Sequence, residues 1–442
     1  MDWKHLLNTT RLMTPDYPEQ PGRPMYMQDI DRITFSAPFR RLANKTQVHP
    51  LYDNDHVHHR LIHSIEVASV GRSLGMEAGQ WLVDRGILTE SERDKVSGIV
   101  QAACLAHDIG NPPFGHSGEE AIGSWFEARL AAPKGIFADL DPACRQEFKK
   151  FEGNAQGFRI LGRTEMYVNE GGMRLSLGVL GAFTKYPATA NISARAPEPY
   201  CGLKKFGLFE QDAGLFAEVA EKLGLPDNAT PQGTWWRRHP LVFLMEAADD
   251  ICYNIMDLED AFTAGDIAFE QAEALLSPLI MSNSQHSYVS QAAHIAAHRA
   301  RAIHGAIAVC VESFKRHYDG LMAGTFSGSL IEVSSKAVEF AAIKRLARER
   351  IFKAARKTEL EVFGRNVIHT TLDGLIPLFE ELRERSWEVD RLSSYPRQLA
   401  RAAGLDLAGI ASAHDALHAL TDFVSGMTDR YAVKVAGMLA GH

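Results

Sequence analysis

Residues 239–262 read HPLVFLMEAADDICYNIMDLEDAF, and the pattern of this stretch decides the fold class. Its apolar residues recur at i, i+3 and i+4 spacing, which is typical of an amphipathic α-helix, and Pro240 suits a first helical turn. The same spacing recurs along the chain, for example at 60–76, 94–107, 117–130, 238–262, 289–318, 336–356 and 409–438. Because strand-like alternation is scarce, the sequence predicts an almost all-α protein.

Short segments rich in proline and glycine separate these helical stretches, at 14–24, 196–202 and 223–233. Such segments form loops, and we interpret them as loops or lobe junctions within one fold. A chain of 442 residues can bury a large core. Length alone would allow two or three domains, so it leaves the domain count open.

The composition is that of an ordinary globular protein, with 45% hydrophobic and 23% charged residues. Because no uncharged apolar run could span a bilayer and the N-terminus does not resemble a signal peptide, we expect a cytoplasmic protein without membrane contact. The net charge of −8 argues against a general nucleic-acid coat protein, although a locally basic cleft could still bind a small polyanion. The five cysteines lie far apart, which argues against a thiolate zinc site or a disulfide framework.

Polar residues interrupt three of the apolar helical stretches. The stretch RLIHSIEVASVGRSLG begins at Arg60, which shares a helix face with His63. In AACLAHDIGNPPFGHSGEE, at 102–120, His107 and Asp108 end an apolar helix, and a buried carboxylate there is costly unless it is paired or bound to a metal. The third stretch is the one quoted first, and it carries an acid–aromatic–acid face at i, i+4, i+8.

Each of these features has a structural interpretation when it is taken alone. His63 can be a hydrogen-bonded core histidine, Asp108 can cap a turn, and the acids of 249–260 can form a solvated face. Together, however, the stretches supply two imidazoles and two carboxylates on helices. This donor set suits Mn²⁺, Fe²⁺, Co²⁺, Ni²⁺ or Mg²⁺, and four ligands on a six-coordinate ion leave room for water and a substrate oxygen. The pattern therefore predicts a catalytic metal site.

Longer motifs run nearly from end to end of the chain: DIDRITFSAPFRRLANKTQVHPL at 29–51, RLIHSIEVA at 60–68, AHDIGNPPFGHSGEEAI at 106–122, FEGNAQGFRIL at 151–161, TKYP at 184–187, MEAADDICYNIMDLEDA at 245–261 and GMTDRYA at 426–432. With these motifs in this order, the sequence resembles the HD-domain superfamily of metal-dependent phosphohydrolases. Within it, the sequence is most similar to the bacterial deoxyguanosinetriphosphate triphosphohydrolase family. The resemblance implies an HD-domain helical fold with additional C-terminal helices.

The resemblance also implies a role for each residue that matches a family motif. The metal ligands would be His63, His107, Asp108 and Asp249, because the family pattern places the last ligand four residues before the tyrosine. His116 would be the catalytic histidine and Glu119 its acidic partner, at a spacing that lets Glu119 orient the ring. The substrate-binding residues would be Arg60, Lys185 and Lys205 at the phosphates, Gln47, Tyr253 and Asp257 at the deoxyribose, and Glu361 at the base.

The implied reaction is the hydrolysis of dGTP or several dNTPs to deoxynucleoside and triphosphate, by attack of water on the α-phosphorus. A divalent ion, Mn²⁺, Mg²⁺ or another first-row ion, would be the cofactor. The alternatives are another HD-type nucleotide phosphohydrolase and a non-catalytic dNTP sensor. We further expect a homo-oligomer, a nucleotide or single-stranded DNA effector, and three parts: an N-terminal segment that contributes to the substrate pocket (1–59), the HD core (60–265) and a C-terminal helical region packed on it (266–442).

Overall fold

Helices α1 to α21 form nearly all of the regular structure, so the predicted all-α class is confirmed. The computed structural model describes residues 1–20, 22–47, 59–165, 172–281, 288–351 and 355–441. In this part of the chain the strands form only one antiparallel hairpin, β1 (Asp227–Thr230) and β2 (Gly233–Trp236), in which Asp227 pairs with Trp236. No helix among these residues is apolar over enough of its length to cross a membrane.

The α-helices of the first half of the chain are α1 (Trp3–Leu6), α2 (Met25–Phe35), α3 (Ala37–Arg41), α4 (Arg60–Asp84), α5 (Glu90–Ala106), α6 (Gly115–Leu130), α7 (Ile136–Asp139), α8 (Arg145–Lys149), α9 (Gly153–Arg159), α10 (Leu177–Phe183), α11 (Ala190–Ser193) and α12 (Ala213–Leu223). Those of the second half are α13 (Val242–Ala264), α14 (Phe269–Leu276), α15 (Gln291–Arg316), α16 (Tyr318–Ala323), α17 (Ala337–Leu346), α18 (Ala355–Glu384), α19 (Ser394–Ala403), α20 (Ala413–Gly426) and α21 (Asp429–Ala440).

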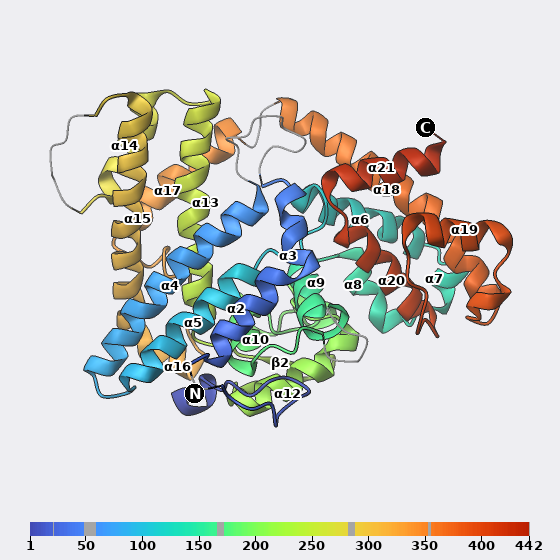
Figure 1. The fold of residues 1–442 in the computed structure, drawn as a ribbon, viewed down its shortest axis with the longest axis horizontal. Helices are drawn as coiled ribbons and strands as arrows, with labels where there is room; N and C mark the ends of the chain where they lie inside the picture. The colour runs from blue at the N-terminus through green and yellow to red at the C-terminus, as the bar shows by residue number, and fades with distance from the viewer. Residues whose placement is uncertain (21, 48–58, 166–171, 282–287, 352–354, 442) are drawn as a thin grey trace.

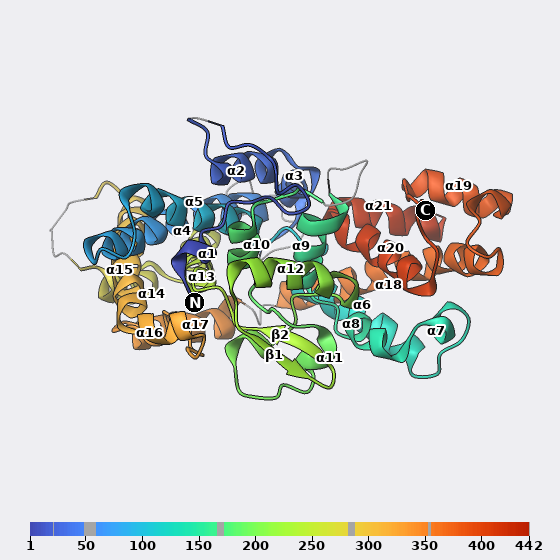
Figure 2. The ribbon, with the colours of Figure 1, turned by 90° about the horizontal axis from the view of Figure 1, so that it is seen from below.

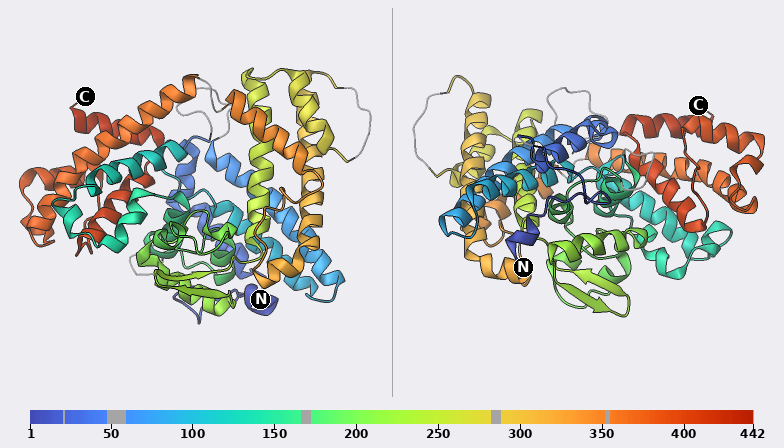
Figure 3. Two further views of the ribbon diagram at one scale, coloured as in Figure 1. Left: turned by 180° about the vertical axis from the view of Figure 1, so that it is seen from behind. Right: turned by 60° about the horizontal axis from the view of Figure 1, so that its bottom comes forward.

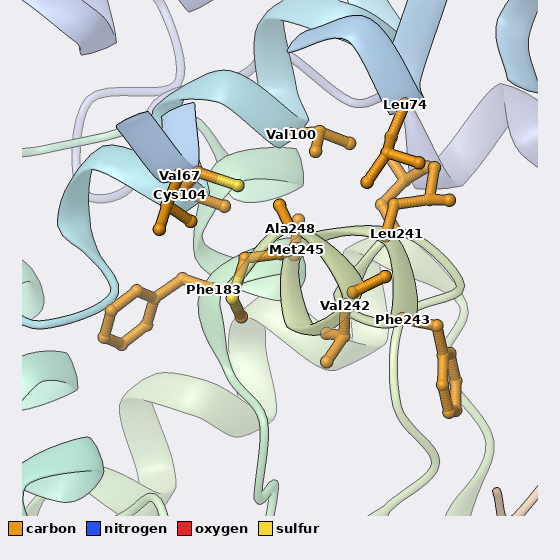
Figure 4. Close-up of a cluster of buried hydrophobic side chains, with 14 of the residues drawn as sticks. Val67, Leu74, Val100, Cys104, Phe183, Leu241, Val242, Phe243, Met245 and Ala248 are labelled. Carbon is orange, nitrogen blue, oxygen red and sulfur yellow. The ribbon is translucent and has the colours of Figure 1, made fainter. Parts of the chain in front are cut away.

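Helices α4, α5 and α13 meet in the larger of two hydrophobic clusters. Figure 4 shows Val67 and Leu74 from α4, Val100 from α5 and Ala248 from α13 within this cluster. Helices α4 and α5 approach so closely that a Cβ atom at Gly75 would lie 2.8 Å from the Cα of Ser97. A larger residue at Gly75 would push apart the two helices that carry His63 and precede His107.

The second hydrophobic cluster joins α6 to α8 with the C-terminal helices α18 to α21. Trp125 and Phe126 of α6 contribute to it, together with Phe379 of α18 and Leu417 of α20. In Figures 1 and 3 these helices lie together at one end of the molecule, and α13 to α17 lie at the other. The β-hairpin lies beside α11, at the edge seen in Figure 2. The division into parts at 59/60 and 265/266 stays a prediction.

Local sequence signals explain several helix ends. Thr89 and Glu92 form a capping box that begins α5, in which the Thr89 N–H donates to Glu92 Oε2 at 2.8 Å. Helix α13 begins at Val242, two residues after Pro240 rather than at it. The predicted stretch 409–438 is two helices, α20 and α21, because the chain extends at Met427 before Thr428 caps α21.

Candidate active site

A cavity of about 580 Å³ lies where α4, α6 and α13 meet the loop after α5. Its wall brings together residues from eight separate parts of the sequence. Among the predicted site residues, those that line it are Gln47, Arg60, His63, His107, Asp108, His116, Lys185, Lys205, Asp249, Tyr253 and Glu361. Glu119 lies behind His116, and Asp257 is buried one helical turn beyond Tyr253, so neither lines this cavity.

The two histidines and two aspartates predicted as ligands converge in this cavity. His63 Nε2 lies 3.3 Å from Asp249 Oδ1, and His107 Nε2 lies 3.5 Å from the same oxygen. His107 Nε2 is also 3.6 Å from Asp108 Oδ1. Helix α4 presents His63 in its first turn, α5 ends just before His107, and α13 presents Asp249 near its middle. Helices therefore fix the backbone of His63 and Asp249, and the turn that follows α5 carries His107 and Asp108.

The hydrogen bonding of His107 suits a ligand of a cation. Its Nδ1 bonds to the carbonyl oxygen of Cys104 at 2.7 Å, and a carbonyl can only accept, so Nδ1 carries a proton. The buried Nε2 makes no hydrogen bond within the described residues, although two carboxylate oxygens lie near it. In a neutral imidazole this nitrogen would direct a lone pair at negative oxygens, which is unfavourable unless a cation lies between them. The donor set therefore fits a divalent metal ion.

Buried cations surround the carboxylates. Arg60 Nη1 donates to Asp108 Oδ2 at 2.6 Å, and Lys185 Nζ donates to Asp249 Oδ2 at 2.9 Å. Burial alone would raise the pKa of both aspartates, but Arg60 holds the pKa of Asp108 below its usual value and Lys185 holds that of Asp249 well below it. Both carboxylates are therefore ionised at neutral pH, as metal ligands must be.

The two neighbouring aspartates of α13 have different surroundings. Asp249 contacts His63, His107 and Lys185, whereas Asp250 lies 3.5 Å from Lys344 and accepts a hydrogen bond from Ser329 at 3.4 Å. Burial raises the pKa of Asp250 to about 6. Of the two, only Asp249 contacts the histidine pair.

His116 and Glu119 form a hydrogen-bonded pair at the start of α6. His116 Nδ1 is 2.6 Å from Glu119 Oε2, and the other carboxylate oxygen accepts from the Gly153 N–H at 2.8 Å. The imidazole is 79% exposed whereas the Glu119 side chain is 9% exposed, so the ring faces the cavity from a fixed carboxylate. The hydrogen bond with Glu119 raises the pKa of His116 above its usual value.

A strained turn sets the position of this pair. Phe114 and Gly115 both have left-handed backbone conformations, with φ of 63° and 59°. A Cβ atom at Gly115 would lie 2.7 Å from Arg60 Nη2, so only glycine leaves room for the arginine. The turn thereby places α6 directly against the guanidinium that binds Asp108.

Residues that were not predicted from the sequence hold the cavity wall together. Asp429, at the start of α21, accepts from the N–H of Thr46 at 3.1 Å and from the N–H of Phe114 at 3.0 Å. Lys45 Nζ donates to the carbonyl oxygens of Asn111 and Ser425, at 2.6 and 2.8 Å. All of these residues except Ser425 lie within the motifs at 29–51, 106–122 and 426–432. Their place in these motifs was the one sign in the sequence that could have pointed to them.

Comparison with known proteins agrees with this arrangement. The HD domain family model matches residues 60–154, which include His63, His107 and Asp108. The chain is 39% identical to a deoxyguanosinetriphosphate triphosphohydrolase-like protein of Pseudomonas aeruginosa, over 100% of this chain and 99% of that protein. A protein of the same name from Synechocystis is 37% identical, again over 100% and 99% of the two chains.

A third relative carries the name without the qualifier. The deoxyguanosinetriphosphate triphosphohydrolase of Klebsiella pneumoniae is 31% identical, over 92% of each chain. The family model and the full-length relatives together place the whole sequence within one group of proteins. The chain therefore belongs to the deoxyguanosinetriphosphate triphosphohydrolase-like family of HD-domain metal-dependent phosphohydrolases.

Proposed function

We propose that this protein hydrolyses deoxynucleoside triphosphates to deoxynucleoside and inorganic triphosphate. The observation that carries the proposal is that a single cavity combines the His63, His107, Asp108 and Asp249 donor set with cationic side chains and with His116, which Glu119 holds from behind. The name of the Klebsiella pneumoniae relative supports the substrate class. The volume of about 580 Å³ lies in the range of small-ligand sites, which is about 300–1,000 Å³.

In this proposal the four donors hold one divalent cation. When bound, the cation would supply positive charge that polarises a phosphate oxygen. The donor set, with two imidazoles and two carboxylates, suits Mn²⁺ or another first-row ion as well as Mg²⁺. Cys104 contributes only its carbonyl oxygen, which fixes the tautomer of His107 as partners of metal-bound histidines commonly do.

The cationic side chains of the cavity would bind the triphosphate. Arg60 is held by Asp108, Lys185 by Asp249, and Lys205 Nζ lies 3.0 Å from Glu152 Oε1. Although burial opposes a charge on each lysine, Asp249 raises the pKa of Lys185 and Glu152 raises that of Lys205, so both are charged at neutral pH. Fixed charges that need no rearrangement are the main source of rate enhancement in phosphoryl transfer.

His116, oriented by Glu119, would act as the general base that accepts a proton from the attacking water. Because Nδ1 of His116 bonds to Glu119, Nε2 is the atom left to accept a proton as water attacks the α-phosphorus. A new phosphorus–oxygen bond forms and the bond to the 5′-oxygen breaks, with the proton finally carried by that oxygen. Glu119 would stabilise the imidazolium formed in between, and the triphosphate would leave intact.

The test is product analysis with each of the four dNTPs and GTP, in Mn²⁺ and in Mg²⁺, carried out in ¹⁸O-labelled water. We expect equal amounts of deoxynucleoside and triphosphate, with the label in the triphosphate. A label in the nucleoside would place the attack at carbon, and release of monophosphate or orthophosphate would indicate a different HD phosphohydrolase. Binding of dNTPs without turnover would support a sensor instead.

A matched pair of variants assigns any turnover to this cavity. His116→Ala should retain bound metal and lose about a hundredfold or more in kcat, the usual scale for a general acid or base. Glu120→Gln changes an exposed neighbour on the same helix and should behave as the unaltered protein. Equal turnover in both variants would show that another group activates water.

A further inference from the structure

A second cluster of metal-binding side chains lies away from the cavity, between α14 and α15. Glu273 of α14 faces His294 and His298 of α15, and one potential ligand atom from each lies within 4.8 Å of the other two. In Figure 1 these helices stand beside α13, at the end of the molecule opposite to α18–α21. The two histidines are spaced i, i+4, so α15 presents both rings on one face.

The separations suit ligands of one ion better than hydrogen bonds. His294 Nε2 lies 3.3 Å from His298 Nε2 and 3.4 Å from Glu273 Oε1. Nitrogen and oxygen ligands at about 2.1 Å from a tetrahedral zinc ion are roughly 3.4 Å apart. A hydrogen bond between a charged nitrogen and a carboxylate is shorter, about 2.7–2.9 Å.

Hydrogen bonding prepares His298 for this role. Its Nδ1 lies 3.1 Å from the carbonyl oxygen of His294, so Nδ1 carries the proton and Nε2 has a lone pair in the neutral ring. Burial and the neighbouring His294 lower the pKa of His298, which favours the neutral form. Tyr288 stacks on the ring of His294, with 4.4 Å between centroids, and limits its rotation.

A third cluster has similar residue types, but its side chains are joined by hydrogen bonds and are not arranged to bind a metal. Glu147 accepts from His414 Nε2 at 2.6 Å and from His418 Nε2 at 3.1 Å. Although burial opposes a charge on the ring, hydrogen bonds with Cys144 and Glu147 raise the pKa of His414 to about 10, so both ring nitrogens carry protons at neutral pH. The proton positions in this cluster satisfy a hydrogen-bond network, and they leave Nε2 of His414 without a lone pair for a metal.

We propose that Glu273, His294 and His298 form a second, non-catalytic binding site for a divalent transition metal, and that Zn²⁺ is the ion it prefers. Two imidazoles and one carboxylate favour Zn²⁺ over Mg²⁺ or Ca²⁺, which select oxygen ligands. The three side chains are half-buried, so water can complete the coordination. A bound ion would link α14 to α15 across the chain segment between residues 277 and 290, and it would stabilise the folded protein by mass action.

The test is a zinc titration of the full-length protein, read out as bound zinc per folded chain and as the shift in Tm. The Asp249→Asn variant serves as the background, so that the cavity donor set is already disabled. We expect this background to bind zinc and the added His294→Ala and His298→Ala substitutions to remove it together with the zinc-dependent rise in Tm. His304→Ala is the matched control, because His304 is an exposed histidine of the same helix, and it should leave zinc binding unchanged.

If the double variant does not fold, the single substitution Glu273→Gln in the same background tests the site by its effect on zinc binding. Loss of even an outer-shell partner commonly weakens a metal site about 10–100-fold, and loss of this ligand should raise the Kd for zinc at least as much. Equal zinc binding by the background and the folded His294→Ala, His298→Ala protein would overturn the proposal. So would binding only at millimolar zinc, and neither result bears on the hydrolytic activity.

Discussion

Asp249 and Asp250 are adjacent in the sequence but point to different surroundings. Asp249 contacts His63, His107 and Lys185. Asp250 instead contacts Lys344 and Ser329. Successive residues of a helix differ in direction by about 100°, which is why only one of the two can reach the histidines. Substituting each aspartate in turn therefore distinguishes the proposed ligand from a neighbouring residue of the same type.

Replacing Asp249 by Asn should abolish Mn²⁺ binding, because the amide cannot supply the negative charge that the ion requires. Asp250→Asn should retain the ion, since that carboxylate contacts neither histidine. Metal content after dialysis against Mn²⁺ measures both variants. The assignment of the ligand fails if Asp250→Asn is the variant that loses manganese.

Glu119 should also determine the pH at which His116 can act. Its hydrogen bond raises the pKa of His116, and a general base must be unprotonated, so activity falls as the pH drops through this raised pKa. Glu119→Gln removes the negative charge that favours the imidazolium. The pKa of His116 should then fall, and the acidic limb of the kcat/KM profile should move to lower pH while the plateau decreases.

The measurement is kcat/KM against pH for Glu119→Gln and for Glu120→Gln. The exposed Glu120 should leave the profile unchanged and so controls for a general loss of negative charge. An acidic limb that stays in place in Glu119→Gln, with only the plateau reduced, would contradict the role of His116 as the titrating base.

At the scale of single residues, the sequence predicts a contact between two side chains when both lie within one helix or one motif. His116 and Glu119 are three residues apart, and a helix brings them together without information from elsewhere. Asn111 was missed although it is three residues from Asp108, because its amide bonds to the carboxylate from within an irregular loop. Loops have no fixed periodicity from which such a contact could be predicted.

At the scale of one element, successive turns of α13 place different residues along the cavity. Asp249 contacts the histidine pair and Tyr253, one turn later, lines the same cavity. If the metal holds the α-phosphate, the sugar lies next along this helix. A rigid ring at that position would exclude the 2′-hydroxyl of a ribonucleotide.

Tyr253→Ala should therefore raise kcat/KM for GTP relative to dGTP, because it opens space beside C2′. Tyr253→Phe keeps the ring and should keep the preference for the deoxy substrate. Both ratios are measured on protein whose circular dichroism matches the unaltered chain. An unchanged ratio in folded Tyr253→Ala would mean that the ring only packs against its neighbours.

Helix α18 shows where periodicity was insufficient. It runs from Ala355 to Glu384, within the C-terminal region expected to be helical, but its apolar spacing did not single it out. Gly364, Gly374 and Pro377 lie inside it, and each lowers helix propensity or removes a backbone donor. Tertiary packing compensates for them, since Ile368, Leu372 and Leu375 are fully buried in the second hydrophobic cluster.

Considered as a whole, the molecule builds its cavity from both ends of the sequence. Gln47 and Glu361 lie far apart in the sequence but both line the cavity. Asp429 accepts hydrogen bonds from both Thr46 and Phe114 and so joins the two segments. These contacts span more than three hundred residues of sequence, so no local pattern could have predicted them. The helical fold class could therefore be predicted from the sequence, whereas the connection of the cavity to the C-terminal helices could not.

Asp429→Asn should weaken this connection and raise KM more than it lowers kcat. The Thr46 and Phe114 N–H groups donate to different carboxylate oxygens, so an amide leaves one of them facing a donor. A hydrogen bond to a charged group is worth about 1.5–3 kcal/mol. The Tm should fall by a few degrees, while bound metal is retained. Thermal melting and steady-state kinetics measure these effects.

The exposed Asp390 provides the matched control for this variant, because Asp390→Asn removes the same charge from the same C-terminal region. It should leave both Tm and KM unchanged. If the two variants behave alike, the contacts of Asp429 have no influence on the cavity.

The dependence on Asp429 also bears on how the protein is made. Translation proceeds from the N-terminus, so His63, His107 and Asp249 leave the ribosome long before the residue that fastens Thr46 beside Phe114. In a nascent chain the proposed metal ligands can therefore come together before the proposed substrate pocket gains these contacts. A nonsense mutation shortly before codon 429 would remove α21, and we expect the resulting polypeptide to lack the contacts that hold Thr46 beside Phe114.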